Sequence, residues 1–132
     1  MYRIYVLADR DTQMERYTKP IQRFCSAKCV FPQIEFHSDQ ESFFESVRNA
    51  APTNALITLR GVAGLNAVEH LRSLLPACGI IWCSDLDFSL HAFRLRADYF
   101  LLEPVTEANL LCGLDVWFEG KNARSIQSKT DQ

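Results

Sequence analysis

The sequence of 132 residues lacks the features of membrane, secreted and strongly charged proteins. No apolar run approaches the ~20 residues that a membrane-spanning helix needs. The first residues, MYRIYVLADRD, contain no basic segment and only a short apolar stretch, so we expect no signal peptide. A formal net charge of −2 gives the chain itself no electrostatic reason to bind nucleic acid or an anionic membrane. We therefore expect a cytoplasmic protein.

The sequence also lacks the cysteine pattern of a disulfide framework or a structural zinc site. Its five cysteines are an odd number with scattered spacing, and only Cys25 and Cys29 are close together. The three histidines are far apart, which suggests neither a metal site nor a Ser–His pair. We expect reduced thiols that pack as small apolar groups.

What the sequence does contain is a regular alternation of two apolar periods. Short apolar or alternating runs predict strands over 2–7, 33–37, 54–59, 79–84 and 98–102. Apolar residues three and four positions apart predict helices over 11–24, 40–50, 64–75, 87–95 and 106–120. This order predicts an α/β fold, (βα)5, with one doubly wound parallel five-stranded sheet in a flavodoxin-like three-layer sandwich.

Individual residues refine these boundaries. Asp39 and Thr106 are predicted helix caps, and Gly120 is predicted to end the last helix. Pro20 should kink the first helix or delay its start. We expect residues 1–120 to form the domain and residues 121–132 to form a flexible tail or the start of a linker.

Ligands of an open parallel sheet collect beyond the carboxyl ends of its strands. Three motifs there, an acidic turn after the first strand, RGVAG after the third and RADYFLLEP at the fifth, resemble the receiver domain of two-component response regulators. RADYFLLEP aligns without gaps on the family's GADDYLxKP, and the resemblance covers about residues 1–118. The longer stretch SLHAFRLRADYFLLEP is similar to receivers that carry LytTR-type DNA-binding domains.

The resemblance implies a particular chemistry at the predicted site. In the family, two acidic residues after the first strand hold Mg²⁺, and an aspartate at the end of the third strand accepts a phosphoryl group. A Thr or Ser after the fourth strand and a Lys after the fifth then bind that group. Phosphoryl transfer of this kind needs a carboxylate nucleophile and cations that neutralise charge on the oxygens.

The first positions of this pattern are altered here. The acidic pair falls on Ala8 and Asp9, with Asp11 close by as a partial substitute. The phosphoacceptor falls on Thr58, although an ungapped match to the loop would place it on Leu56, and NALITLRGVAG contains no acidic residue. Thr58 could itself be phosphorylated, but a β-branched residue is also common in a strand, and we favour that interpretation.

The later positions are altered as well. The hydroxyl position falls on Cys83, with Ser84 next to it as a stand-in, and the lysine falls on Glu103 before Pro104. Cys83 could be a redox thiol of low pKa, or simply a small residue at a strand end, which we favour. The switch aromatic falls on Phe100, which lacks a hydroxyl.

The acid at position 103 makes the predicted pocket unsuitable for phosphate. Two unit charges ~4 Å apart interact by about 4 kcal/mol at an effective dielectric near 20, so exchanging attraction for repulsion is a swing on the order of 8 kcal/mol before screening. Asp9, Asp11 and Glu103 could instead bind a divalent cation. We expect Glu103 to pair with Arg60 or Arg10, and we expect neither a catalytic residue nor a bound cofactor.

A second candidate surface comprises the predicted fourth helix, fifth strand and fifth helix. Its residues of interest are His91, Arg94, Arg96, Tyr99 and Trp117. In receivers this face is what the resemblance implies for dimer contacts, and aromatic and arginine side chains are enriched at interface cores. An amphipathic helix whose arginines extend into water is the alternative.

These observations predict an atypical receiver domain that works without phosphorylation and is not an enzyme. It would act as a protein–protein interaction or dimerisation module in bacterial signal transduction and transcriptional regulation. DNA would be bound only through an additional domain or a partner, and no membrane contact is expected. The alternatives are a divergent but active Mg²⁺-dependent phosphoacceptor, or a small-ligand or metal sensor that uses the vestigial pocket.

Overall fold

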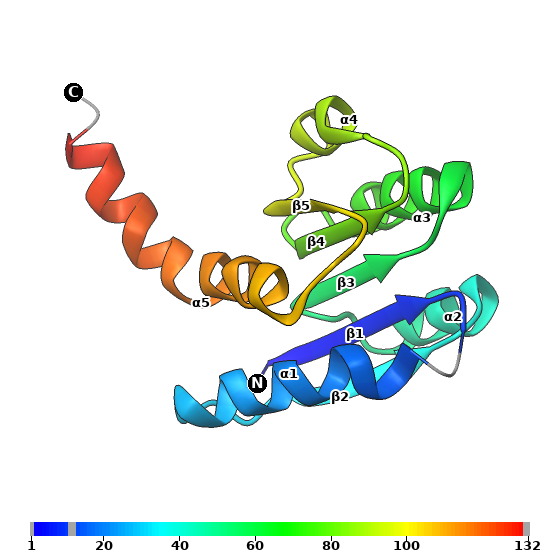
Figure 1. The fold of residues 1–132 in the computed structure, drawn as a ribbon, viewed down its shortest axis with the longest axis horizontal. Coiled ribbons are helices and arrows are strands. Elements are labelled where there is room, and N and C mark those ends of the chain that lie inside the picture. The colour runs from blue at the N-terminus through cyan, green and yellow to red at the C-terminus, as the bar shows by residue number, and fades with distance from the viewer. Residues whose placement is uncertain (1, 11–12, 131–132) are drawn as a thin grey trace.

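The computed structural model describes the backbone of residues 2–10 and 13–130 and the side chains of this range up to residue 118. Five parallel strands form one sheet in the order β2-β1-β3-β4-β5. The strands are β1 (Arg3–Ala8), β2 (Gln33–His37), β3 (Asn54–Thr58), β4 (Gly79–Ser84) and β5 (Tyr99–Leu102). The helices are α1 (Met14–Ala27), α2 (Gln40–Asn49), α3 (Gly61–Leu74), α4 (Ser89–Arg94) and α5 (Glu107–Thr130). The predicted doubly wound α/β fold is confirmed (Figure 1).

Two separate apolar cores cover the two faces of the sheet. Ile57 and Trp82 pack with side chains of α2 and α3, whereas Leu56 and Ile81 pack with those of α1 and α5. Figure 1 shows the same division of the helices into two layers. Because both faces are covered, β3 is buried along its whole length and has no polar alternation.

Local signals place several helix ends where the sequence predicts them. The Asp39 carboxylate accepts a hydrogen bond from the Ser42 backbone N–H at 2.8 Å, which caps α2. The Thr106 hydroxyl accepts one from the Asn109 N–H at 3.1 Å and caps α5 in the same way. Pro20 lies inside α1 with its ring buried, so α1 continues past a residue that has no N–H to donate to the preceding turn.

Several helix ends differ from the prediction: α1 spans Met14–Ala27 and not 11–24, and α4 spans Ser89–Arg94 and not 87–95. Two further differences, at α3 and α5, have identifiable causes. α3 begins at Gly61 instead of residue 64, so most of the RGVAG motif forms its first turn. Gly61 has a φ of 64°, a left-handed conformation that glycine adopts without strain, which lets the chain turn directly from β3 into the helix. α5 continues to Thr130 and does not end at Gly120, because a single glycine weakens a helix by only about 1 kcal/mol. The assignment of residues 121–132 to a tail or linker stays a prediction.

Candidate functional site

The carboxyl edge of the sheet brings together the positions that the sequence assigns to a phosphorylation site. Thr58, the last residue of β3, is in register with Ala8 of β1 and with Cys83 of β4. All three side chains are buried, as is that of Ser84. Asp9 follows β1 and is exposed, whereas Asp11 lies outside the described residues. The edge therefore contains a hydroxyl and a thiol where the family pattern has a carboxylate and a hydroxyl.

The Thr58 hydroxyl has a partner from α1 that the sequence did not predict. The Tyr17 phenol lies 3.3 Å from the Thr58 Oγ1, and both side chains are buried. Burial raises the pKa of Tyr17, so the phenol is neutral at physiological pH. Tyr17 belongs to the predicted apolar stripe of the first helix, and helical spacing alone does not reveal where its hydroxyl ends. The contact closes one side of the position where a phosphoryl group would be attached.

Glu103 forms the ion pair that the sequence predicts. Arg60 Nε, at the start of α3, lies 3.3 Å from Glu103 Oε2, beyond the end of β5. The Glu103 backbone N–H also donates to the Ser84 carbonyl at 2.8 Å, and the peptide bond to Pro104 is cis. The arginine side chain is 60% exposed, so the pair contributes no more than about 1 kcal/mol to stability. Its chief effect is that the Arg60 guanidinium is already engaged by a carboxylate.

Cys83 does not have the character of a reactive thiol. Burial, and to a smaller extent the nearby Glu103 charge, raises the pKa of Cys83 to about 12. The thiol is therefore protonated at neutral pH and inaccessible, and the interpretation of a redox sensor of low pKa is wrong.

Asp85 is a residue of the site that the sequence analysis missed. Its Oδ1 accepts a hydrogen bond from the Gly61 backbone N–H at 2.8 Å, which ties the loop after β4 to the first turn of α3. That hydrogen bond lowers the pKa of Asp85. The neighbouring Ser84 hydroxyl accepts from the Leu86 N–H at 3.2 Å, so it is part of the same loop. The only feature of the sequence that could have indicated this role of Asp85 is its position directly after β4.

The described residues do not fit a divalent-cation site. No three side chains of His, Cys, Asp or Glu lie together as a ligand set anywhere in the described part of the chain. Of the candidate carboxylates, Asp9 is exposed and Glu103 is paired with Arg60. Hard cations such as Mg²⁺ need several oxygen ligands at once, and we derive no step that involves this ion.

Phe100 is held in an aromatic cluster. Its ring meets that of Trp82 edge-on at 5.3 Å, and Trp82 stacks on Phe88 with an interplanar angle of 12°. Trp82 is fully buried and Phe100 is half-buried. Contacts of this kind stabilise each aromatic pair by about 0.5–1.5 kcal/mol beyond burial. The cluster connects the aromatic position of β5 to the start of α4.

The predicted interface residues have unequal exposure. His91, Arg94 and Arg96 are exposed, and Tyr99 is partly buried. Trp117 is only 4% exposed, so its assignment to the interface is wrong. It continues the inward stripe of α5, three residues after Leu114, and packs in the core under α1 and α5.

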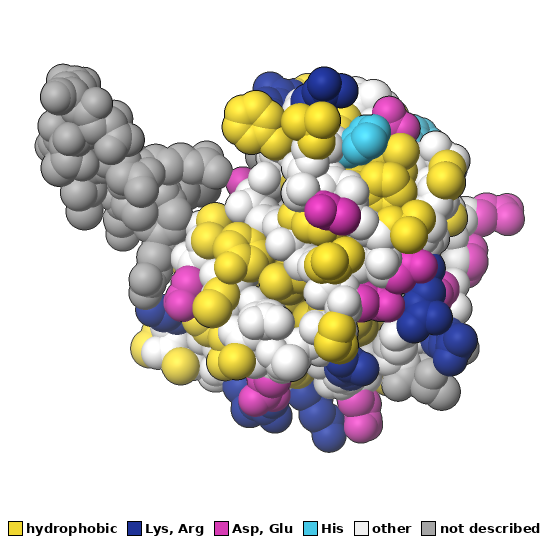
Figure 2. Space-filling view, turned by 45° about the horizontal axis from the view of Figure 1, so that its top comes forward, with side chains coloured by type: hydrophobic (Ala, Val, Ile, Leu, Met, Phe, Trp, Pro, Cys, Tyr) yellow, Lys and Arg dark blue, Asp and Glu magenta, His cyan; other side chains and the backbone are white. Residues whose placement is uncertain are grey.

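Exposed apolar side chains extend the same face. Leu90 and Phe93 of α4 are 58% and 80% exposed, and Leu102 at the end of β5 is 49% exposed. Figure 2 shows hydrophobic side chains on the surface over α4, close to basic ones. We refer to Leu90, Phe93 and Leu102 as the α4–β5 patch.

One side-chain set at the end of β2 contradicts the expectation of no Ser–His pair. His37 Nδ1 lies 3.1 Å from the Ser42 hydroxyl, and His37 Nε2 lies 3.0 Å from Glu35 Oε1. The Ser42 hydroxyl, however, donates to the Asp39 carboxylate at 2.9 Å. A serine whose proton is committed to the helix cap is not activated by the histidine, so the set is structural.

Comparisons with known proteins identify the fold. No protein-family model and no curated protein matches the sequence. A response regulator receiver domain protein from Clostridium thermocellum matches with a TM-score of 0.74 and 15% identity, over 93% of this chain and 98% of the other. The response regulator DrrB from Thermotoga maritima matches with a TM-score of 0.73 and 17% identity, over 92% of this chain and 54% of DrrB. A two-component transcriptional regulator from Clostridium phytofermentans has a TM-score of 0.70 and 18% identity over the whole of both chains.

These neighbours share one class of structure, and the likeness at such identities concerns the fold. The chain has the fold of response-regulator receiver domains, with five parallel strands that alternate with five helices. No helix in the described ranges combines the length and the apolar character that crossing a membrane requires.

Proposed function

We propose that this chain is a degenerate receiver domain, a cytoplasmic module that signals by association and not by phosphorylation. The observation that carries the proposal is the closed carboxyl edge, where Thr58 contacts Tyr17 and Arg60 is paired with Glu103. The module would act in bacterial two-component signal transduction and transcriptional regulation, without enzyme activity of its own. The C. phytofermentans neighbour is named as a two-component transcriptional regulator, which supports this context.

The chemistry of the edge supports the absence of phosphorylation. A phosphoacceptor needs a nucleophile, and the Thr58 hydroxyl is far less nucleophilic than a carboxylate unless a base activates it. No described residue serves as that base, because the neighbour of Thr58 is a neutral phenol. Glu103 would also repel the oxygens of a transferred phosphoryl group.

The α4–β5 patch supports association through this face. Phe93, in the last turn of α4, is 80% exposed, and a large apolar side chain in water favours burial against a partner. His91 and Arg94 lie beside it on the same helix and are exposed. An apolar centre with basic and aromatic neighbours is typical of interface hot spots. We propose a second copy of the chain as the partner, and DNA binding only through an additional domain or another protein.

The association can be tested with two phenylalanines of equal exposure. Sedimentation equilibrium should show a homodimer, and Phe93→Asp should raise its dissociation constant by about tenfold or more, the size of a typical hot-spot loss. Phe31, which is 78% exposed before β2, provides the control: Phe31→Asp should leave the dimer unchanged. A chain that stays monomeric, or an equal loss in both variants, would contradict the proposal.

Phosphorylation is tested separately. The chain and a receiver domain with an intact aspartate should be incubated with Mg²⁺ and acetyl phosphate and then weighed by intact-mass spectrometry. The control should gain the mass of one phosphoryl group, about 80 Da for each transfer. This chain should gain none, and a stable adduct would favour a divergent but active receiver.

A further inference from the structure

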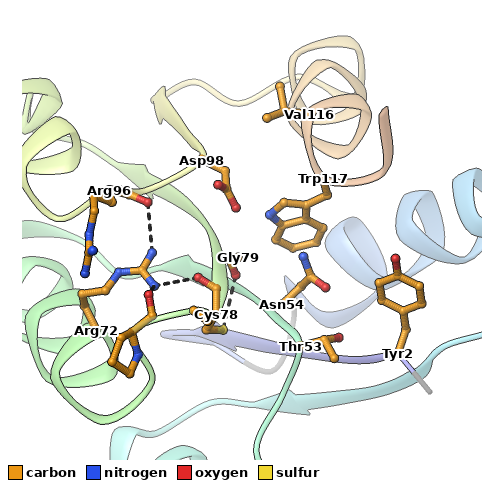
Figure 3. Close-up of a pocket in the computed structure, with 12 residues that line it drawn as sticks. Tyr2, Thr53, Asn54, Arg72, Cys78, Gly79, Arg96, Asp98, Val116 and Trp117 are labelled. Atoms are coloured by element: carbon orange, nitrogen blue, oxygen red, sulfur yellow. Dashed lines mark hydrogen bonds between the residues drawn. The ribbon is translucent and has the colours of Figure 1, made fainter. Parts of the chain in front are cut away.

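The amino edge of the sheet contains a pocket that the receiver comparison does not explain. Its volume is about 720 Å³, within the usual range for small-molecule sites. It lies where β3, β4 and β5 begin, at the opposite edge from Thr58, and α5 forms one wall (Figure 3). Tyr2, Asn54, Gly79, Asp98 and Trp117 are among the residues that line it.

The pocket contains a buried hydrogen-bond donor without an acceptor. Trp117 is 4% exposed, and its indole Nε1 has no hydrogen-bond partner among the described residues. The Trp82 indole is in the same state, but Trp82 does not line the pocket. An unsatisfied buried donor costs about 1–3 kcal/mol, and a native structure keeps one only when something else compensates. An acceptor atom on a bound ligand would satisfy this N–H.

Polar groups from three elements converge beside that donor. A Cβ atom on Gly79 would lie 2.6 Å from Asn54 Nδ2, 2.8 Å from Asp98 Oδ2 and 3.4 Å from Trp117 Nε1. Glycine therefore leaves room for these side chains to approach one another at the start of β4. Figure 3 shows the Asn54 carboxamide and the Trp117 indole next to each other on the pocket wall. Their N–H groups are suited to the oxygens of a ligand.

The charge of the wall favours an anion. Two arginines, Arg72 and Arg96, and one aspartate, Asp98, line the pocket, in a chain whose overall charge is −2. Arg96 is exposed and forms no ion pair with any described residue. The buried Arg72 guanidinium is bonded only to neutral backbone carbonyls. The wall thus combines two cations, of which Arg96 is exposed, with the neutral donors of Asn54 and Trp117 and the single carboxylate of Asp98.

We propose that this pocket binds a small organic anion, a carboxylate- or phosphate-bearing metabolite. Arg96 would bind the acidic group, and an oxygen elsewhere on the ligand would accept from Trp117 and Asn54 once the Asn54 side chain turns toward the opening. Arg72 Nε donates to the Leu95 carbonyl at 2.8 Å, and an Arg72 terminal nitrogen donates to the Arg96 carbonyl at 3.0 Å. These hydrogen bonds connect the pocket wall to the residues that follow α4. Binding would therefore adjust the α4–β5 patch from the far edge of the sheet.

Trp117 provides a direct readout, because the chain has only two tryptophans. In a Trp82→Phe variant, the fluorescence of Trp117 should be recorded during titration with citrate, 2-oxoglutarate, AMP and inorganic phosphate at constant ionic strength. At least one organic anion should change the emission saturably, whereas glycerol and choline should not. Arg96→Glu should weaken that binding by about tenfold or more, the value of one charge-assisted hydrogen bond.

A matched arginine distinguishes a site from general charge. Arg94 is exposed on α4 and does not line the pocket, so Arg94→Glu should change the affinity by no more than about twofold in physiological salt. The proposal is overturned if no organic anion gives saturable binding, if both variants lose affinity equally, or if inorganic phosphate binds as tightly as the organic anions.

The unsubstituted chain gives a second test that does not need the Trp82 variant to fold. A ligand that binds the native state raises the melting temperature as its concentration rises. The increase should occur with the same anion, persist in Arg94→Glu and disappear in Arg96→Glu; an increase that persists in Arg96→Glu would contradict the site. Since this pocket and Thr58 lie at opposite edges, either proposal can fail without the other.

Discussion

The two edges of the sheet differ in what the side chains at their candidate sites contact. At the carboxyl edge, Thr58 contacts Tyr17, and Arg60 contacts Glu103. At the amino edge, the Trp117 N–H has no acceptor among the described residues and lies beside a pocket of about 720 Å³. Gln13 Oε1 and the Trp82 N–H also lack a partner among them, but neither residue lines this pocket. Buried polar groups that already have partners gain little from a ligand, whereas an unpaired one gains a full hydrogen bond. The positions that bind phosphate in the receiver pattern are thus already engaged by protein groups, while the opposite edge offers an unpaired donor inside a pocket.

The largest expected effect concerns the arginine that organises the amino edge. The side chain of Arg72 is buried and donates to five backbone carbonyls. These belong to Leu75, Pro76, Cys78, Leu95 and Arg96. Arg72→Ala should lower the free energy of unfolding by about 3 kcal/mol or more, because buried carbonyls lose charged donors. Urea denaturation measures this loss, and Arg94→Ala, on an exposed arginine, should cost less than about 0.5 kcal/mol. A loss of similar size in both variants would contradict the view that the hydrogen bonds of Arg72 stabilise the amino edge.

The next largest effect is a pH dependence of stability, which tests whether Cys83 is buried at the carboxyl edge. The folded-state pKa of Cys83 is raised from 9.0 to about 12. Its contribution to stability is therefore fully present below pH 9 and is lost as the pH rises toward 12, because the unfolded chain ionises first. In Cys83→Ala, the fall of the unfolding free energy over this range should be less steep, whereas Cys112→Ala, at an exposed cysteine, should keep the original slope. Denaturation at several pH values measures the slope of the unfolding free energy against pH. Equal slopes in Cys83→Ala and the unsubstituted chain would contradict the burial of this thiol.

A smaller effect isolates the contact that closes the phosphoacceptor position. Tyr17→Phe removes the phenol that lies 3.3 Å from Thr58 Oγ1 and should cost about 1 kcal/mol of stability. A double-mutant cycle with Thr58→Val measures the coupling, since the valine removes the partner hydroxyl. Additive effects of the two substitutions would show that the hydroxyls do not interact, and the carboxyl edge would then be more open than described.

The smallest effect is expected at the surface of the same edge. Arg60→Ala removes the ion pair with Glu103 and should lower stability by about 0.5 kcal/mol, decreasing as salt is added. Thermal denaturation at low and high ionic strength measures this. A loss that is large and insensitive to salt would mean that the pair is more buried than the 60% exposure of Arg60 indicates.

Much of this arrangement can be predicted from the sequence, because parallel strands align their carboxyl ends. The positions of Ala8, Thr58 and Cys83 as neighbours follow from strand ends alone, and the register confirms it. The strands over 33–37 and 79–84 have the predicted bounds. The Arg60–Glu103 pair could also be predicted, since both residues follow strands of the same sheet.

Other features depend on contacts between distant residues. Spacing places Tyr17 on the inner stripe of α1 but does not show that its hydroxyl reaches Thr58, 41 residues away. The early start of α3 involves Asp85, which bonds to Gly61 from the loop after β4. Trp117 was assigned to a surface by its residue type, although its position three residues after Leu114 indicated the core. The amino-edge pocket has no motif, because residues from five separate segments form it.

The central claim is that the carboxyl edge does not accept a phosphoryl group. A crystal grown with Mg²⁺ and beryllium fluoride, which imitates such a group, tests this claim most directly. We predict an edge without bound fluoride complex, with the Tyr17–Thr58 and Arg60–Glu103 contacts intact. A beryllium fluoride complex seated beside Glu103, with Tyr17 displaced from Thr58, would contradict the claim.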